Sequence, residues 1–229
     1  MNDQLTLYLL TIRGTLAPAT LDAARKVHNQ TAGNPAGVAA AQSLGDVSHM
    51  VYVPMQHDGH TKTKGAGEFL IMDLWHSMDG LNTFFADKQV QEGGAAIFSD
   101  RDPVVWAPAD GFTTFHIPAP FGKNDRIIAV VRGTVKSLAE AKKLHNTAMT
   151  KTISKARKLG MLSHEAYFRM AAPNSPEALE FFAVDVWMDS EGMGDYYGDE
   201  DFLTGFNHLF TAEAADSVWV HPKGDWIEW

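Results

Sequence analysis

Runs of aliphatic and β-branched residues predict the same series of strands twice along the chain. The first strand is expected at 7–12 (LYLLTI) and again at 126–131 (RIIAVV). The second and third strands are expected at SHMVYV and EFLIMDLW, which begin at residues 48 and 68. Their later counterparts are SHEAYF and EFFAVDVW, which begin at residues 163 and 180. Each set closes with a strand that carries Trp106 or Trp219.

A helical spacing of apolar residues follows each first strand. Pro18 and Thr20 mark the start of the earlier helix. In the later copy, Ser137 and Glu140 form a capping box. Shorter helices rich in Phe, Tyr and Gly are expected after each third strand, at 79–87 and 191–199.

Five sequence blocks recur in the same order, which indicates a tandem duplication. The clearest pair is EFLIMDLW and EFFAVDVW, and RGTLAPATLDAARKVHN at 13–29 matches RGTVKSLAEAKKLHN at 132–146. The seam falls in IPAPFGKND at 117–125, so we expect one repeat at 1–120 and the other at 121–229. The order of elements within each repeat is β-α-β-β-α-β, the ferredoxin-like unit.

The duplicated unit resembles the dimeric α+β barrel superfamily. The resemblance covers nearly the full length and rests on the order of elements and on the duplication. It implies an α+β fold in which two ferredoxin-like sheets face each other and enclose a cavity. The superfamily includes cofactor-independent monooxygenases, muconolactone-type isomerases, haem proteins of the chlorite dismutase and dye-decolourising peroxidase kind, and stress-response proteins.

Composition restricts the partners. The chain has no cysteine and a formal net charge of −9, which disfavours nucleic acid and anionic membrane surfaces. No apolar run approaches the length of a membrane span. We therefore expect a cytoplasmic protein with a small-molecule ligand, and the helix faces could join two copies as a homodimer.

Strand alternation divides the third strand into two faces. Leu70, Met72 and Leu74 are expected to pack under the helices, which turns Asp73 and Trp75 toward the cavity. Asp185 and Trp187 would do the same in the second repeat. Arg13 and Arg132, at the ends of the neighbouring first strands, could pair with these aspartates or help them to anchor a ligand. Four residues of the second strands are expected to share that cavity: Tyr52, Glu165, Tyr167 and Arg169.

The histidines of the second strands would then point to the helix side. His28 lies seven residues after Leu21, on the apolar stripe of the helix, and His145 has the same place in the second repeat. His28 could meet His49, and His145 could meet His164, beneath each helix. Such pairs could be structural, or could form part of a site; a metal would need a third ligand, and strand alternation puts Asp73 on the other face.

Differences between the repeats give further candidates. His57 and His60 have H-x-x-H spacing but lie in a Gly- and Lys-rich segment that is typical of a solvated loop. His76 follows Trp75 and is replaced by Met188 in the second repeat, so it is a lone acid–base candidate at a strand end.

Three classes of function fit these observations. The first is an enzyme, monooxygenase-like or isomerase-like, that acts without an organic cofactor on a partly aromatic or enolisable ligand. Its catalytic candidates are Asp73, Asp185, His49, His164 and His76; its ligand-binding candidates are Arg13, Arg132, Tyr52, Tyr167, Glu165, Arg169, Trp75, Trp187, His28 and His145. The second is a non-catalytic binding or stress-associated protein, and the third is a haem protein with His145 or His164 as axial ligand. No metal ligands are assigned.

Overall fold

The computed structural model describes residues 6–55, 67–117, 126–171 and 178–229. The segment with His57 and His60 lies outside the described residues. The chain divides into two compact units. Unit 1 contains the elements of the first repeat and also His221–Trp229, whereas unit 2 contains Pro108–Val220.

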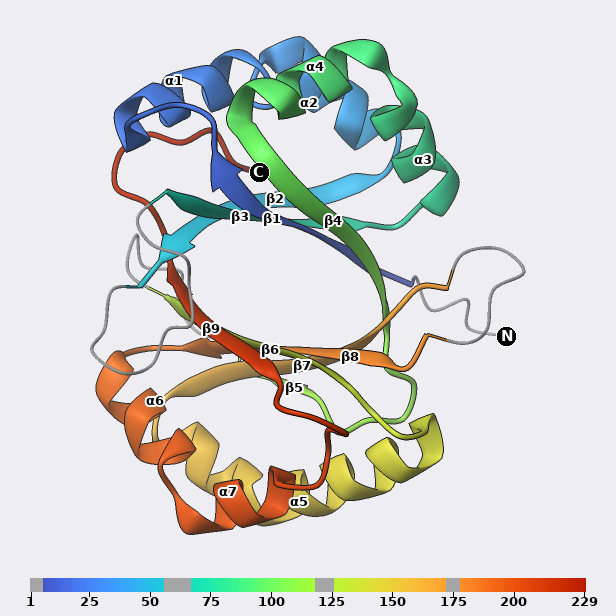
Figure 1. Cartoon of the computed structure of the whole chain (residues 1–229), viewed down its shortest axis with the longest axis vertical. Helices are drawn as coiled ribbons and strands as arrows, with labels where there is room; N and C mark the ends of the chain where they lie inside the picture. Colours follow the sequence, from blue (N-terminus) through green and yellow to red (C-terminus); the bar gives the residue numbers. More distant parts are fainter. Residues whose placement is uncertain (1–5, 56–66, 118–125, 172–177) are drawn as a thin grey trace. The chain divides into compact units, whose positions relative to one another are not determined.

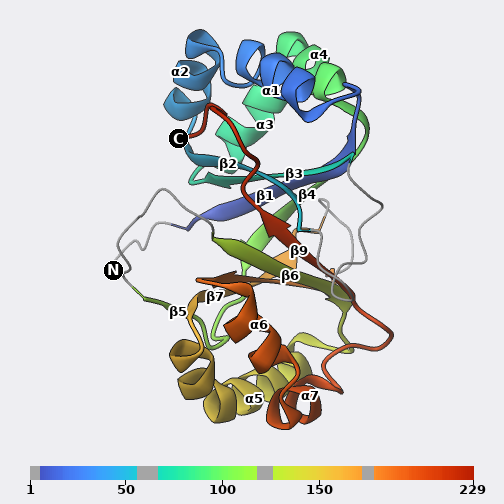
Figure 2. The same ribbon diagram turned by 90° about the vertical axis from the view of Figure 1, so that its left-hand side faces the viewer.

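Unit 1 has the predicted ferredoxin-like order with extra helices. Its strands are β1 (Tyr8–Leu16), β2 (Asp46–Pro54), β3 (Glu68–Trp75) and β4 (Phe98–Pro108), in the sheet order β4-β1-β3-β2. Its helices are α1 (Leu21–Gln30), α2 (Pro35–Ser43), α3 (Met78–Ala86) and α4 (Lys88–Ile97). These helices lie on one face of the sheet (Figures 1 and 2).

Unit 2 repeats this plan. Its strands are β5 (Phe115–His116), β6 (Ile127–Thr134), β7 (Met161–Arg169), β8 (Glu180–Trp187) and β9 (Ala215–Val220), in the order β9-β6-β8-β7-β5. Its helices are α5 (Leu138–Lys158), α6 (Ser190–Tyr197) and α7 (Glu200–Phe206). They again cover one face of the sheet (Figures 1 and 2).

The first helix is continuous in unit 2 and broken in unit 1. Ser137 caps α5 by accepting a hydrogen bond from the Glu140 amide, and Thr20 caps α1 in the same way, as predicted. In unit 1, Asn34 caps a new helix at Pro35, because proline cannot donate to the preceding turn and is favoured at the first helical position. The chain therefore forms α1 and α2 where unit 2 has α5.

The face assignment of the third strand is opposite to the one predicted. Phe69, Ile71 and Trp75 pack in the unit 1 core together with the helix residues Ala24 and Leu81. Trp187 lies in the equivalent core of unit 2. The odd-numbered residues of β3 therefore face the helices, and Asp73 goes with them because alternate strand residues share a face. Simple alternation could not choose between two faces that are both apolar.

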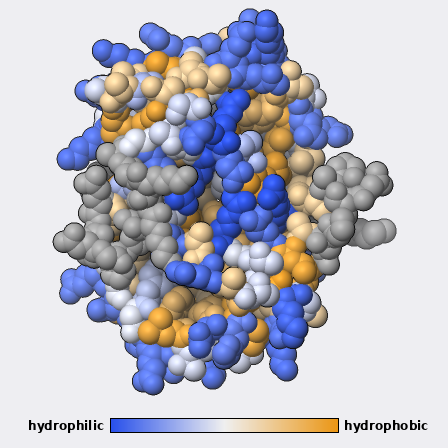
Figure 3. Space-filling view, viewed as in Figure 1, coloured by the Kyte–Doolittle hydropathy of each residue, from blue (hydrophilic) through white to orange (hydrophobic). Residues whose placement is uncertain are grey.

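The face of the molecule shown in Figure 3 has mixed polarity. In Figure 3, hydrophilic and hydrophobic residues are interspersed over the face that is shown. Among the described residues, no helix is long and apolar enough to cross a membrane.

Candidate functional site

Each unit contains a pair of buried histidines between its first helix and its sheet. His28 on α1 and His49 on β2 approach with their Nε2 atoms 2.9 Å apart, and the rings stack at 5.2 Å. His145 on α5 and His164 on β7 repeat the contact at 2.8 Å. The predicted meeting of helix and strand histidines beneath each helix is therefore confirmed.

An aspartate on the third strand extends each pair. His49 Nδ1 and Asp73 Oδ1 are hydrogen-bonded at 2.7 Å, and His164 Nδ1 and Asp185 Oδ1 at 2.5 Å. His49 is directly opposite Asp73 in the β2–β3 register, and directly opposed residues of a sheet share a face. The prediction that Asp73 lies on the other face, away from the histidines, was wrong for this reason.

An asparagine begins each chain of contacts and fixes its direction. His28 Nδ1 lies 3.0 Å from Asn29 Oδ1. Asn29 Nδ2 donates to the carbonyl of Asp225, and Asn29 Oδ1 accepts from the amide of Ile227. In unit 2, Asn146 is held in the same way by the carbonyl of Gly111 and the amide of Thr113. Backbone donors and acceptors cannot exchange roles, so the amide oxygen faces the histidine in both units.

This orientation determines where the protons are. His28 Nδ1 must carry a hydrogen to donate to Asn29, so Nε2 of a neutral His28 is an acceptor and His49 Nε2 is the donor. The contact between His49 Nδ1 and Asp73 then holds one further proton. Either His49 is an imidazolium beside a carboxylate, or Asp73 carries the proton, and the unit 2 chain has the same arrangement.

The electrostatics of unit 1 agree with this count. Burial and the nearby His49 lower the pKa of His28 to about 4, so His28 is neutral near pH 7. Burial also opposes charge on His49, but the charge and hydrogen bond of Asp73 outweigh it and raise the pKa of His49. In unit 2, burial and His164 lower the pKa of His145 to about 4.

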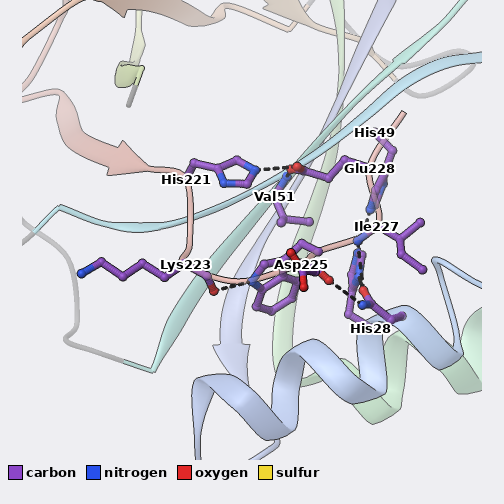
Figure 4. Close-up of polar contacts among 10 residues, drawn as sticks. His28, His49, Val51, His221, Lys223, Asp225, Ile227 and Glu228 are labelled. Carbon is purple, nitrogen blue, oxygen red and sulfur yellow. Dashed lines mark hydrogen bonds and ion pairs between the residues drawn. The ribbon is translucent and has the colours of Figure 1, made fainter. Parts of the chain in front are cut away.

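Aromatic residues that follow β9 in the sequence cover the histidines of unit 1, and aromatic residues that follow β4 cover those of unit 2. In unit 1, Trp229 stacks on His49 with ring centroids 4.5 Å apart, and Trp226 meets His28 edge-on at 5.2 Å. Glu228 accepts from the Val51 amide and pairs with His221 (Figure 4). In unit 2, Phe115 lies over His164 and Phe112 beside His145.

In unit 2, a tyrosine hydroxyl caps the aspartate end of the hydrogen-bonded Asn–His–His–Asp series. The Tyr197 hydroxyl donates to Asp185 Oδ2 at 2.5 Å and accepts from the Trp187 indole at 3.2 Å. Burial and Asp185 raise the pKa of Tyr197 well above its usual range, so the hydroxyl keeps its proton. Both oxygens of Asp185 are thus occupied.

The corresponding end is open in unit 1. Phe85 stands where the second repeat has Tyr197. Within the described part of the chain, His49 is the only side chain that hydrogen-bonds Asp73, and the buried Trp75 indole N–H has no partner. Asp46, which is Met161 in the second repeat, is buried beside this end. Burial and the charge of Asp73 raise the pKa of Asp46 to about 7.

Each histidine chain borders a cleft on the helix side of its own sheet. The cleft of unit 1 has a volume of about 1090 Å³ and reaches Asp46, His49, Asp73, Phe85 and Trp229. Residues of α2 form part of its wall, so the break at Pro35 helps to shape it. The cleft of unit 2 is about 450 Å³ and reaches Asp185 and Tyr197 among several phenylalanines.

The two predicted arginines have other partners than expected. Arg13 pairs with Glu68 at 2.5 Å and Arg132 with Glu180 at 2.6 Å, so neither meets the aspartate that was predicted for it. Their strand positions place them opposite Leu70 and Phe182, on the sheet face that turns away from the helices.

The remaining predicted ligand-binding residues of the second strands share that face. Tyr52 is opposite Leu70, and Glu165 and Tyr167 are opposite Val184 and Phe182. Arg169 joins Glu180 at 3.0 Å, and Glu165 lies 2.8 Å from His116. The structure does not bring these residues to the histidine chains. Their assignment to a cavity between the sheets stays a prediction.

His76 is exposed at the end of β3, beside Gly45, and is not part of the histidine chain. Trp75 and Trp187 are fully buried and face the helices; they do not line the sheet's other face as predicted.

The haem hypothesis fits these residues poorly. An axial histidine must direct a free ring nitrogen at the iron. Both nitrogens of His145 and of His164 already take part in hydrogen bonds. Among the described residues there is also no group of three metal-binding side chains arranged around a common point.

Sequence reasoning missed the asparagines, Tyr197 and Asp46. Asn29 and Asn146 follow the helix histidines in both copies of the block that ends in HN, so their recurrence was a signal. Tyr197 and Asp46 are positions where the repeats differ, and only the fold shows that both differences lie at the aspartate.

Comparisons with known proteins support the fold. No protein-family model and no curated protein matches the chain. Among solved structures, an anthrone oxidase-like protein superposes with a TM-score of 0.62 at 12% identity, covering 96% of this chain and 93% of the other. A mutant of chlorite dismutase from Candidatus Nitrospira defluvii superposes with a TM-score of 0.55 at 8% identity, covering 96% of this chain and 92% of the other.

A third match is an uncharacterized ferredoxin fold protein from Listeria monocytogenes, related to antibiotic biosynthesis monooxygenases. It gives a TM-score of 0.52 at 9% identity and covers 96% of this chain and 97% of the other. Such low identities define the fold and not the activity. The chain has a tandem ferredoxin-like α+β fold similar to that of these structures, as its duplicated sequence predicted.

Proposed function

We propose that the protein is an enzyme that removes a proton from a small phenolic or enolisable compound, and that the cleft of unit 1 is its active site. The observation that carries this proposal is the open end of the histidine chain. Asp73 borders the cleft and uses one oxygen for His49, and no described side chain hydrogen-bonds the other. A carboxylate in this position is a general base.

The buried chain suits this role because it balances charge. When Asp73 takes a proton from the substrate, the imidazolium of His49 remains and faces the new substrate anion. The site therefore does not have to bury a net negative charge, which would be costly in an apolar cleft. The neutral His28 and Asn29 hold the His49 ring in place from behind.

Asp46 supplies the complementary acid. A carboxyl whose pKa is raised to about 7 carries a proton in a large share of molecules near neutral pH. It can donate this proton to an oxygen or carbon of the substrate as the anion is discharged. A protonated carboxyl group beside a second carboxyl group that acts as the base is a common arrangement for acid–base catalysis.

Proton removal is the step shared by a cofactor-independent oxygenase and an isomerase. The resemblance in fold to an anthrone oxidase-like protein and to a relative of antibiotic biosynthesis monooxygenases supports the oxygenase as the first candidate. In that reaction an activated CH₂ group and O₂ give a carbonyl and water. In an isomerase, the anion is reprotonated at another carbon and no O₂ is used.

The proposal is tested by turnover of anthrones, quinols and lactones, with O₂ consumption followed in parallel. Asp73→Asn keeps the size of the side chain but removes the base, and we expect kcat/KM to fall about 10²- to 10⁴-fold. Asp185→Asn in unit 2 is the matched control. Tyr197 closes that chain, so we expect less than a threefold change.

Equal losses in the two variants would remove unit 1 as the site. Full activity of Asp73→Asn would remove the mechanism, provided that its thermal unfolding shows a folded protein. Consumption of O₂ in step with product would separate the oxygenase from the isomerase.

Ligand binding without turnover is a second candidate, favoured by the closed chain of unit 2. There Tyr197 occupies the base, yet a cleft of about 450 Å³ remains. Saturable binding of an aromatic compound to a protein that turns over none of the substrates above would favour this function.

A further inference from the structure

We infer that the cleft of unit 1 recognises its ligand through a phenolic hydroxyl, which takes the position that the Tyr197 hydroxyl has in unit 2. This inference names the ligand class of the proposed active site and so rests on that assignment. It follows from the comparison of the two repeats at one pair of positions.

The hydroxyl of Tyr197 makes two contacts at the end of the unit 2 chain. It donates to the outer oxygen of Asp185 at 2.5 Å and accepts from Trp187 Nε1 at 3.2 Å. The Tyr197 ring packs against Trp187 with centroids 5.6 Å apart. In unit 2, the phenol group at this position is therefore a side chain of the protein itself, Tyr197 of α6.

Unit 1 keeps the acceptor and the donor but has no hydroxyl between them. Asp73 and Trp75 have the same register on β3 as Asp185 and Trp187 on β8. The Phe85 ring is 6.1 Å from Trp75, so it has the place of the tyrosine ring. Trp75 is fully buried, and its indole N–H has no partner within the described residues.

An unsatisfied buried donor is rare in folded proteins, and its partner is then a water molecule or a ligand. The cleft provides the route, because Asp73 and Phe85 both border it. Its other walls near this point include the aromatic rings of Phe84 and Trp229. A flat ring with one hydroxyl fits these surroundings, since the ring would stack and the hydroxyl would donate to Asp73 and accept from Trp75.

The test is a titration with p-cresol, the side chain of tyrosine, followed by calorimetry and by the indole N–H resonances of the ¹⁵N-labelled protein. The resonance of Trp75 is assigned from a Trp75→Phe variant. For the natural protein we expect one binding site and a shift of the Trp75 resonance. Toluene, which lacks the hydroxyl, should bind at least tenfold more weakly.

Exchanging the two side chains should move the site. Phe85→Tyr supplies the hydroxyl from within, so we expect p-cresol affinity to fall at least tenfold while Tm stays equal or rises. Tyr197→Phe opens unit 2, and the stoichiometry should increase from one to two.

Three results would overturn the inference: equal affinity for toluene and p-cresol, unchanged p-cresol affinity in Phe85→Tyr, or an unmoved Trp75 resonance on binding. A lower Tm of Phe85→Tyr would also overturn it, because the hydroxyl would then have no place there. Since these readouts need no turnover, failure of the hydroxyl site is distinct from failure of Asp73 as a base.

Discussion

The two units contain the same Asn–His–His–Asp chain but differ at its acidic end. In unit 2, the Tyr197 hydroxyl occupies the second oxygen of Asp185, and Met161 lies opposite Trp187. In unit 1, Phe85 and Asp46 have these positions, and the first helix is broken at Pro35. The residues that the two units share are buried, and their polar groups therefore need hydrogen-bond partners within the protein. The differences lie at the boundary with the cleft, where a ligand can interact.

The largest expected effect is the loss of a strand histidine. His164→Phe removes the imidazole that pairs with the buried Asp185 and leaves it with the Tyr197 hydroxyl alone among the described side chains, so we expect the free energy of unfolding to fall by about 3–5 kcal/mol in urea denaturation. His49→Phe should cost less, about 1–3 kcal/mol, because water in the larger cleft can solvate Asp73. Equal losses would show that the two ends are equally sealed.

Removal of the tyrosine hydroxyl should have the next largest effect. Tyr197→Phe deprives both Asp185 and Trp187 of a partner, so we expect a loss of about 1–3 kcal/mol. Tyr196→Phe, which removes a hydroxyl bonded to Thr152, is the control and should cost about 0.5–1.5 kcal/mol. A smaller effect at Tyr197 than at Tyr196 would contradict a closed chain in unit 2.

The pH dependence of stability should separate the units further. The pKa of His28 and of His145 is lowered to about 4 in the folded protein, so their contribution is lost as pH falls from 6.5 toward 4. The pKa of Asp46 is raised from 3.8 to about 7, so its contribution is present at low pH and lost as pH rises toward 7. In unit 1 the two dependences oppose each other.

Asp46→Met, which copies unit 2, removes one side of that balance. Between pH 4 and 6.5 we expect the variant to lose stability with acid more steeply than the natural protein, by up to about 1.4 kcal/mol per pH unit. At pH 8 it should be the more stable protein. Parallel curves of unfolding free energy against pH would show that Asp46 titrates normally.

The smallest expected effect concerns the C-terminal cover of unit 1. Glu228→Gln removes the charge that pairs with the half-exposed His221 but retains an acceptor for the Val51 amide. We expect a loss of at most about 1 kcal/mol. The exposed Asp110→Asn is the control, and thermal unfolding is the measurement. A loss above about 3 kcal/mol would mean that this pair is needed to seat the cover.

The sequence predicted the fold well because duplication doubles every signal. The two copies agree on element order, on both helix starts and on the histidines beneath the helix. The face of Asp73 could not be predicted, since β3 is apolar on both faces and a register shift in β2 lies between Asp46 and Ser48. Arg13 pairs with Glu68 and not with Asp73, and the alternation of strand residues does not tell which of these two carboxylates an arginine will choose. Tyr197 and Asp46 become meaningful only when the register shows what they face.

The aromatic rings that cover each histidine pair come from the other repeat. Trp226 and Trp229 cover the histidines of unit 1 but follow the last strand of the second repeat in the sequence. Phe112 and Phe115 cover the histidines of unit 2 but follow the last strand of the first repeat. Neither repeat by itself contains both a histidine pair and the aromatic rings that cover it. Expression of residues 1–120 alone would therefore leave the rings of His28 and His49 without Trp226 and Trp229.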